Sequence, residues 1–279
     1  MKFLFVSCIL TLGLWIATAL PAAEPALVEV GGRSLQIPAP EGFERADRVL
    51  PLYDEVCEAM LPPSNRRLVA FARPEFVAKL RAGEIDDADR HFALQSTKQF
   101  EEKEISERAF RGAREALKQE LEGLRAKLDE ETQKLIASGK TTLAKQQGVE
   151  LDLSVSDTAM LGFFEETDTA LGFTLAMNVQ TPQGRDRQVC AAVVAPLQGR
   201  LVNFYAYSNY ASEADRQWVE TAARAWKDAA MATNPRVPGS VLDGFDFGSV
   251  ASSALVGGVV GLVIGLGQWL RKKRSRPVA

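Results

Sequence analysis

Residues 188–208 read QVCAAVVAPLQGRLVNFYAYS, and this stretch decides the fold. Two runs rich in valine, alanine and aromatic residues are joined by Gln198-Gly199-Arg200, a connection short enough to make them antiparallel neighbours in a sheet. In a strand over residues 201–208, Val202, Phe204 and Ala206 would face one way and Asn203, Tyr205 and Tyr207 the other, so both faces carry apolar bulk. We therefore expect both faces of the sheet to be covered.

Two further runs, residues 160–165 and 172–181, precede this pair and predict a four-stranded antiparallel meander. After it, Ser212-Glu213-Ala214-Asp215 has the pattern of a capping box and predicts the start of a helix. That helix ends at Asn234-Pro235, and its buried stripe consists of Trp218, Ala222, Ala225, Trp226 and Ala229. The order of elements predicts the α+β class, with an antiparallel sheet flanked by helices.

The N-terminal part of this region also predicts mixed strands and helices. Gly31-Gly32 separates residues 27–30 from residues 34–37, which is typical of a tight hairpin. A short helix over residues 52–60, a strand over 67–72, a helix over 75–81 and a strand over 91–95 are expected to follow.

The longest helical pattern covers residues 98–137. Its apolar stripe is formed by Phe110, Ala113, Leu117, Leu121, Leu124, Leu128 and Leu135. Unbroken, such a helix would be about 60 Å long, so we expect it to project as an arm or to bend near Gly112 or Gly123. Either it lies on the sheet, or it offers a coiled-coil surface to a protein partner.

The segment Ile37–Phe43, IPAPEGF in sequence, the meander and the closing tryptophan helix together resemble the PsbP/Mog1-like α/β/α sandwich group. This group includes bacterial envelope proteins, and the resemblance would extend over most of residues 27–232. It implies an α/β/α arrangement of layers, and it maps no catalytic site onto this chain. A helix as long as 98–137 is not expected from a minimal member.

Residues 249–270, SVASSALVGGVVGLVIGLGQWL, contain no charge and are followed at once by RKKRSR. As a helix they would span about 33 Å, enough for a hydrocarbon core of about 30 Å. We expect a single transmembrane helix after a juxtamembrane linker (235–248), with residues 271–279 as a basic cytoplasmic tail. The alternative is a C-terminal sorting signal that is removed.

Gly257, Gly261 and Gly265 recur every fourth residue in this segment. Such a small-residue face favours close helix–helix contact and predicts a homodimer through the membrane helix. The alternative explanation is that glycine is simply more frequent in membrane helices.

Residues 1–23 resemble a secretory signal peptide, with Lys2, an apolar run over residues 3–16 and Ala17-Thr18-Ala19 as a cleavage pattern. The alternative is an uncleaved signal anchor. We expect residues 24–234 to lie in the periplasm of a bacterium, held at the inner membrane.

The charge and the cysteine content further limit the possible partners and functions. When Lys2 and the five basic residues of the tail are set aside, 27 Lys and Arg remain against 36 Asp and Glu, a net charge of −9. Such an acidic domain argues against nucleic acid as a partner. Cys57 and Cys190 remain after signal removal and form either one disulfide or two separate buried thiols.

The sequence contains few motifs that are typical of catalytic, phosphate-binding or metal-binding sites. His91 is the only histidine, which excludes any site with several histidine ligands. Gly139-Lys140-Thr141 lacks the earlier glycine of a phosphate-binding loop, and Asp86-Asp87-Ala88-Asp89 lacks the spacing of a calcium loop. We expect no catalytic residue, no cofactor and no metal.

Asn203, Tyr205 and Tyr207 form a polar and aromatic set on one face of the last strand, near Asn209 and Tyr210. They either line a ligand groove or lie beneath a helix. The sequence thus favours a membrane-anchored, non-enzymatic binding or scaffolding protein of the bacterial envelope. The alternative is a domain that binds a small molecule or a glycan through this tyrosine-rich face, with or without hydrolysing it.

Overall fold

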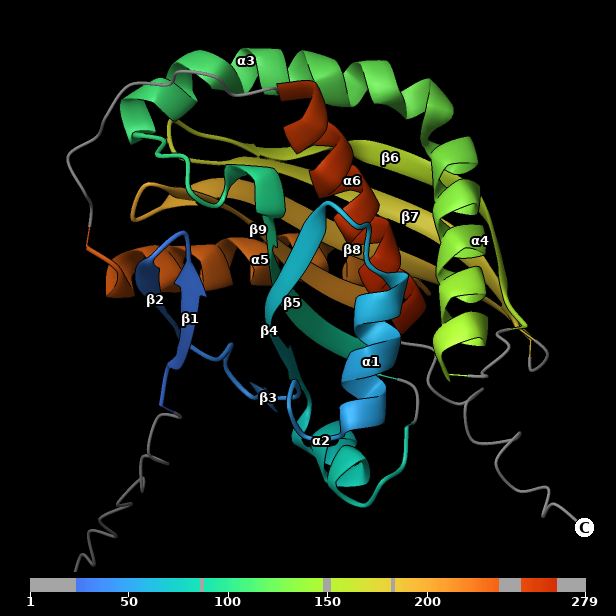
Figure 1. Cartoon of the computed structure of the whole chain (residues 1–279). Coiled ribbons are helices and arrows are strands. Elements are labelled where there is room, and N and C mark those ends of the chain that lie inside the picture. Colours follow the sequence, from blue (N-terminus) through green and yellow to red (C-terminus); the bar gives the residue numbers. More distant parts are fainter. Residues whose placement is uncertain (1–23, 86–87, 148–151, 182–183, 236–246, 265–279) are drawn as a thin grey trace, which may run out of the picture.

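The structure is a computed structural model that describes residues 24–85, 88–147, 152–181, 184–235 and 247–264. The predicted signal peptide, most of the linker and the basic tail lie outside these residues, as does Gly265. A large antiparallel sheet with helices against both faces forms the centre of the molecule (Figure 1). The predicted α+β class is confirmed.

Seven strands build the sheet in the order β3-β4-β5-β9-β8-β7-β6, and every neighbouring pair is antiparallel. The last four strands along the chain form the predicted meander. The bounds are β3 (Glu44–Arg45), β4 (Asn65–Ala72), β5 (Arg90–Thr97), β6 (Ser154–Glu166), β7 (Leu171–Thr181), β8 (Gly184–Leu197) and β9 (Arg200–Asn209).

A separate hairpin of β1 (Ala26–Val30) and β2 (Arg33–Ile37) confirms the turn predicted at the paired glycines. Gly31 and Gly32 have φ angles of 54° and 73°. Glycine adopts this left-handed region without the steric penalty that a side chain brings, which is why the pair sits at the turn.

One face of the sheet packs on α5 (Glu213–Thr233) and on the hairpin. Trp226 of α5 lies edge-on to Phe71, Phe92 and Phe204 of the strands, with ring centroids 5.1–5.8 Å apart. The middle of this interface is therefore a continuous aromatic and aliphatic core.

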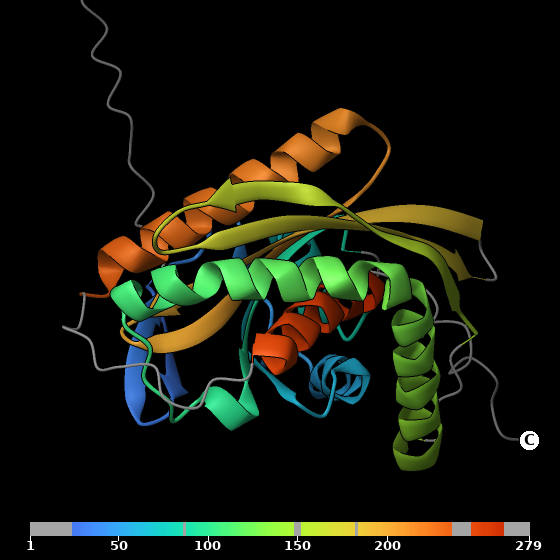
Figure 2. The ribbon, with the colours of Figure 1, turned by 90° about the horizontal axis from the view of Figure 1, so that it is seen from above.

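The opposite face packs on α1 (Pro51–Met60), α3 (Glu107–Leu124), α4 (Leu128–Gln147) and α6 (Phe247–Ile264). Figure 2 shows these helices and α5 on opposite sides of the sheet. The remaining helix, α2 (Pro74–Arg81), packs near β3 in a small cluster of its own. The expectation that both faces are covered is confirmed.

The helix predicted over residues 98–137 differs in three respects. Its first residues form a short 3-10 turn (Lys98–Phe100), and α3 begins only after Ser106, whose hydroxyl accepts a hydrogen bond from the Ala109 N–H. A second 3-10 turn (Arg125–Lys127) separates α3 from α4, which continues to Gln147. The predicted bend near Gly123 is present, and α4 runs in a different direction from α3 (Figure 2).

The C-terminal apolar segment was expected to be a membrane helix. In the structure α6 lies on the sheet beside α3, with Val250, Ala251, Ala254 and Leu255 buried in the shared core. Among the described residues, no helix has both the length and the apolar character that crossing a bilayer requires.

Candidate functional site

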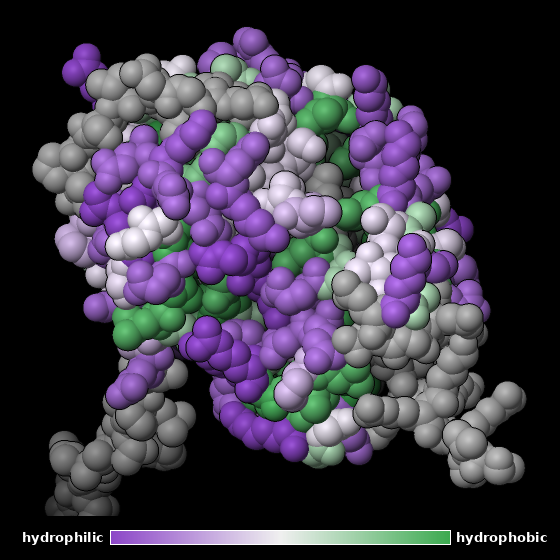
Figure 3. Space-filling view, viewed as in Figure 1, coloured by the Kyte–Doolittle hydropathy of each residue, from purple (hydrophilic) through white to green (hydrophobic). Residues whose placement is uncertain are grey.

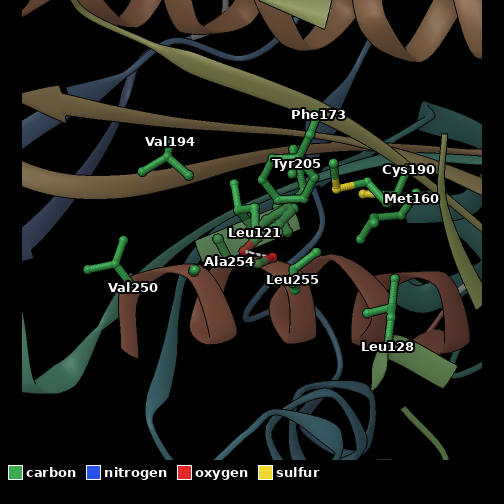
Figure 4. Packing of buried hydrophobic residues seen from close by; sticks show 14 of the residues in the cluster. Leu121, Leu128, Met160, Phe173, Cys190, Val194, Tyr205, Val250, Ala254 and Leu255 are labelled. Atoms are coloured by element: carbon green, nitrogen blue, oxygen red, sulfur yellow. Dashed lines mark hydrogen bonds between the residues drawn. The ribbon is translucent and has the colours of Figure 1, made fainter. Parts of the chain in front are cut away.

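The contact between α6 and the sheet brings together a set of buried polar side chains. Besides α3, the helix contacts α1, α4 and strands β5, β7, β8 and β9. Figure 4 shows Val250, Ala254 and Leu255 of α6 near Tyr205 and Val194 of the strands. Under α6 the sheet presents a group of polar residues that we call the polar floor: Asn65, Gln95, Thr97, Tyr205 and Tyr207.

Strand register explains how these five residues share one face. Asn65 of β4 lies opposite Thr97 of β5, and further along β5 Ala93 lies opposite Tyr205 of β9. Because side chains alternate along a strand, every second residue of β5 and β9 points toward α6. The intervening residues, such as Phe204, point toward α5.

All five residues of the polar floor are buried, and the two tyrosines have no exposed surface. Buried polar groups are costly unless they form hydrogen bonds. The partners here are in α6: Tyr205 Oη donates to the carbonyl of Ala254 at 3.0 Å, as Figure 4 shows, and Tyr207 Oη donates to that of Gly257 at 3.2 Å.

The two amides continue the pattern. Asn65 Nδ2 donates to the Ser253 carbonyl at 3.0 Å, and Gln95 Nε2 reaches the Gly257 carbonyl at 3.4 Å. The hydroxyls of Thr97 and Ser253 are 2.7 Å apart, and Ser253 Oγ also donates to Asn65 Oδ1. The polar floor therefore binds the backbone of α6 on the side where residues 253, 254 and 257 face the sheet.

Small residues make this close approach feasible. A Cβ atom on Gly257 would lie 2.5 Å from Tyr205 Oη, 2.6 Å from Gln95 Oε1 and 2.8 Å from Asn65 Nδ2. A Cβ on Gly258 would lie 2.9 Å from Leu175 Cδ1. Any side chain at position 257 would push α6 away from the donors, so glycine is required by the contact itself.

The chemistry of the polar floor is hydrogen bonding between neutral groups. Burial raises the pKa of Tyr205 and Tyr207 well above 10, so both remain phenols that donate. Burial likewise raises the pKa of Cys190, whose thiol is then not the thiolate that nucleophilic attack needs. His91 stacks on Tyr207 with ring centroids 4.5 Å apart and lies near the Ala88 carbonyl.

The predicted site residues are only partly brought together. Tyr205 and Tyr207 stack on each other, 5.9 Å between centroids, and hold α6. Asn203 is buried on the same strand, and its Oδ1 has no hydrogen-bond partner among the described residues. In the structure this face is not an open ligand groove, because α6 covers it.

Sequence reasoning missed Asn65, Gln95 and Thr97. Gln95 and Thr97 are two residues apart in β5 and so lie on one face of the strand, but Ser96 between them is also polar, so the alternation that would mark this face is weak. Asn65 begins β4 two residues after Pro63, and no pattern in the sequence marks it.

The two cysteines are free, buried thiols in different places. Cys57 lies in the cluster around Tyr53 and Phe76, whereas Cys190 lies in the core beneath α6. The structure therefore has the separate thiols, not the disulfide. Burial raises the pKa of Cys57 to about 11.

The other features considered in the sequence serve the domain itself. The apolar stripe of α3 (Phe110, Ala113, Leu117 and Leu121) is buried within the core that includes α6. Lys140 Nζ donates to the Leu153 carbonyl. Among the described residues, no three His, Cys, Asp or Glu side chains are grouped as a metal site requires.

Outside the polar floor, a pocket of about 480 Å³ opens between α1 and α4. Its lining includes Asp54, Glu55 and Glu58 of α1 and Gly139 of α4. Burial raises the pKa of Glu58. The face of the molecule that carries α1 is otherwise mostly polar, with apolar patches between the polar side chains (Figure 3).

Comparison with known proteins adds no family to this description. The chain matches no protein-family model, and it matches none of the curated proteins. The resemblance to the PsbP/Mog1-like group therefore rests on the short IPAPEGF motif and the order of elements alone.

Proposed function

We propose that this chain is a membrane-anchored, non-enzymatic binding or scaffolding protein of the bacterial envelope. Residues 24–234 would form its periplasmic domain, and residues 271–279 would remain in the cytoplasm. The observation that carries the proposal is the uncharged run 249–270 followed directly by RKKRSR.

The chemistry of the sheet supports binding as the activity. The polar floor offers neutral donors that recognise acceptor groups, and burial keeps its two phenols, like the nearby Cys190 thiol, in their protonated forms. In the structure α6 occupies this surface, and the carbonyl groups of Ala254 and Gly257 accept from it.

The second candidate is binding of a glycan or small molecule at Asn203, Tyr205 and Tyr207. Stacked tyrosines beside amides are suited to such ligands, which favours this candidate. With α6 in place both tyrosines are fully buried, so a ligand could reach them only after α6 leaves. We therefore rank it second.

Fractionation of bacteria that produce the full chain tests the proposal. The protein should stay in the membrane pellet after alkaline carbonate extraction. Alkaline phosphatase should be active when fused after residue 234 and inactive when fused after Ala279, because the enzyme folds only outside the cytoplasm.

A pair of variants sharpens this test. Val260→Arg places a charge in the middle of the uncharged run and should release the protein, since arginine at the centre of a membrane helix costs about 2.5–3.5 kcal/mol. Ser249→Arg adds the same side chain at the edge and should leave the protein in the pellet. Carbonate release of the unchanged chain, or an active fusion after Ala279, would refute the anchor.

A further inference from the structure

We propose that the polar floor is a docking site for the chain's own C-terminal helix, and that this helix exchanges between the sheet and the bilayer. The inference rests on the proposed function in one respect, namely that residues 249–270 are the anchor. The two positions exclude each other, because α6 cannot be buried against Tyr205 and in lipid at the same time.

α6 alone does not meet the length and apolar character of a membrane span, but the uncharged run to which it belongs continues in the sequence to residue 270. The helix contains no charged residue, and its backbone groups bond to each other in either place. A carbonyl oxygen has two lone pairs, so the oxygens of Ser253, Ala254 and Gly257 can accept from the polar floor without giving up their helical bonds. Leaving the sheet therefore breaks no bond within α6.

The polar groups of the sheet face can be satisfied both with α6 in place and without it. When α6 is absent, the polar atoms of Gln95, Tyr205 and Tyr207 can form hydrogen bonds with water instead. The opposite face differs: α5 rests on Phe71, Phe92 and Phe204, which have no such replacement for a lost partner. The α6 face thus differs from the α5 face in having polar groups that water can satisfy, although α6 also buries apolar residues such as Leu175 and Val194.

Gly257 determines which helix fits. Three polar atoms lie within 2.8 Å of the place where its Cβ would be, so the site accepts a helix only where a glycine meets the donors. The bilayer imposes no such restriction, and a larger apolar residue at this position would favour insertion. A single substitution therefore separates docking from membrane binding.

Cysteine crosslinking of the full chain tests docking directly. The side-chain oxygens of Thr97 and Ser253 are 2.7 Å apart, so a Thr97→Cys/Ser253→Cys variant should form a disulfide on mild oxidation. The matched control is Thr97→Cys/Ser252→Cys, because Ser252 is the neighbouring serine on the exposed side of α6. The chain is synthesised without lipid and then mixed with vesicles of phosphatidylethanolamine and phosphatidylglycerol.

Without vesicles, the first pair should crosslink and the control should not. With vesicles, the chain should float with the lipid and the crosslinked fraction should fall at least fivefold. Flotation with an unchanged crosslink would refute the exchange and leave the anchor standing. A crosslink without flotation would refute the anchor, and with it the exchange. Equal crosslinking of both pairs, or of neither, would refute docking.

A second pair of variants removes the dependence on the cysteine substitutions. Gly257→Leu and Ser252→Leu add the same apolar side chain to the same helix, but only the first blocks the contact with the polar floor. Gly257→Leu should shift the chain toward vesicles at least threefold relative to Ser252→Leu. Equal partition of the two variants would refute the competition between sheet and bilayer.

Discussion

Single residues set how closely α6 can approach the sheet, and glycines show this most clearly. Gly257 is buried against three polar atoms of the polar floor, whereas a Cβ on Gly112 of α3 would meet no atom within 4 Å. The same residue type therefore has opposite roles in two helices. One glycine is required by packing, and the other only adds flexibility to the unfolded chain.

Two alanine substitutions test this contrast. Gly257→Ala should lower the free energy of unfolding by about 1–3 kcal/mol, as overpacked sites do. Gly112→Ala should raise it by about 0.4–1 kcal/mol, because alanine favours a helix and nothing obstructs its methyl group. Urea unfolding of the lipid-free chain measures both, and changes of the same sign would contradict the close contact.

The burial of Cys57 leads to a second prediction for a single residue, which concerns the stability of the chain at alkaline pH. Its pKa is about 11 in the folded chain against an ordinary value of 9.0, because burial disfavours the thiolate. Above pH 9 the unfolded chain loses this proton first, so the free energy of unfolding should fall between about pH 9 and pH 11. Below pH 9 the thiol has no effect on the pH dependence.

The raised pKa of Cys57 predicts that the free energy of unfolding falls by on the order of 2–3 kcal/mol between about pH 9 and pH 11. Cys57→Ala should make the decline with pH shallower, because it removes the buried thiol whose pKa is raised. Unfolding followed by circular dichroism at several pH values is the measurement. An unchanged slope in Cys57→Ala would contradict the burial of this thiol.

At the scale of elements, local pattern predicted most strands and helices. Alternation and short turns identified the meander, paired glycines identified the first hairpin, and the capping box identified the start of α5. The 3-10 turn (Arg125–Lys127) between α3 and α4 was not predicted in detail, because the apolar spacing continues through it. Only the tertiary contacts of the two helices fix where the chain changes direction.

The position of α6 could not be predicted for a different physical reason. An apolar helix without charge is equally compatible with lipid and with a protein core, and its period does not distinguish the two. The residues that bind it come from positions 65, 95–97 and 205–207, on three strands. Tyr205 and Tyr207 are marked by the local pattern of β9, but their proximity to residues 65, 95 and 97 depends on the sheet topology, which no local pattern reveals.

The C-terminal helix also carries a prediction about self-association in the membrane. Gly257, Gly261 and Gly265 would form a face that allows two copies to approach closely. Gly261→Ile should therefore lower the signal of a bacterial membrane two-hybrid assay several-fold. Val263→Ile, a change away from this face, serves as the control, and equal signals for the two variants would contradict the homodimer.

At the scale of the whole molecule, the sheet separates two kinds of interface. Its α5 side is an aromatic core, whereas its α6 side combines an apolar core with the polar floor. In our account the first holds the domain together, and the second binds a helix that also serves as the anchor. The central claim is therefore that α6 covers Tyr205 and Tyr207 in one state and uncovers them in the other.

Nitration of tyrosines in the unsubstituted chain tests this claim most directly, because all four tyrosines lie in described parts of the fold. Tyr210 is partly exposed and reports on the reagent, whereas Tyr53 is buried in another cluster and reports on unfolding. Mass spectrometry then measures modification at each position with and without lipid vesicles. We predict that Tyr205 and Tyr207 are protected without lipid and modified with it, while Tyr53 stays protected throughout. Modification of both tyrosines without lipid, or their protection in both conditions, would contradict the account.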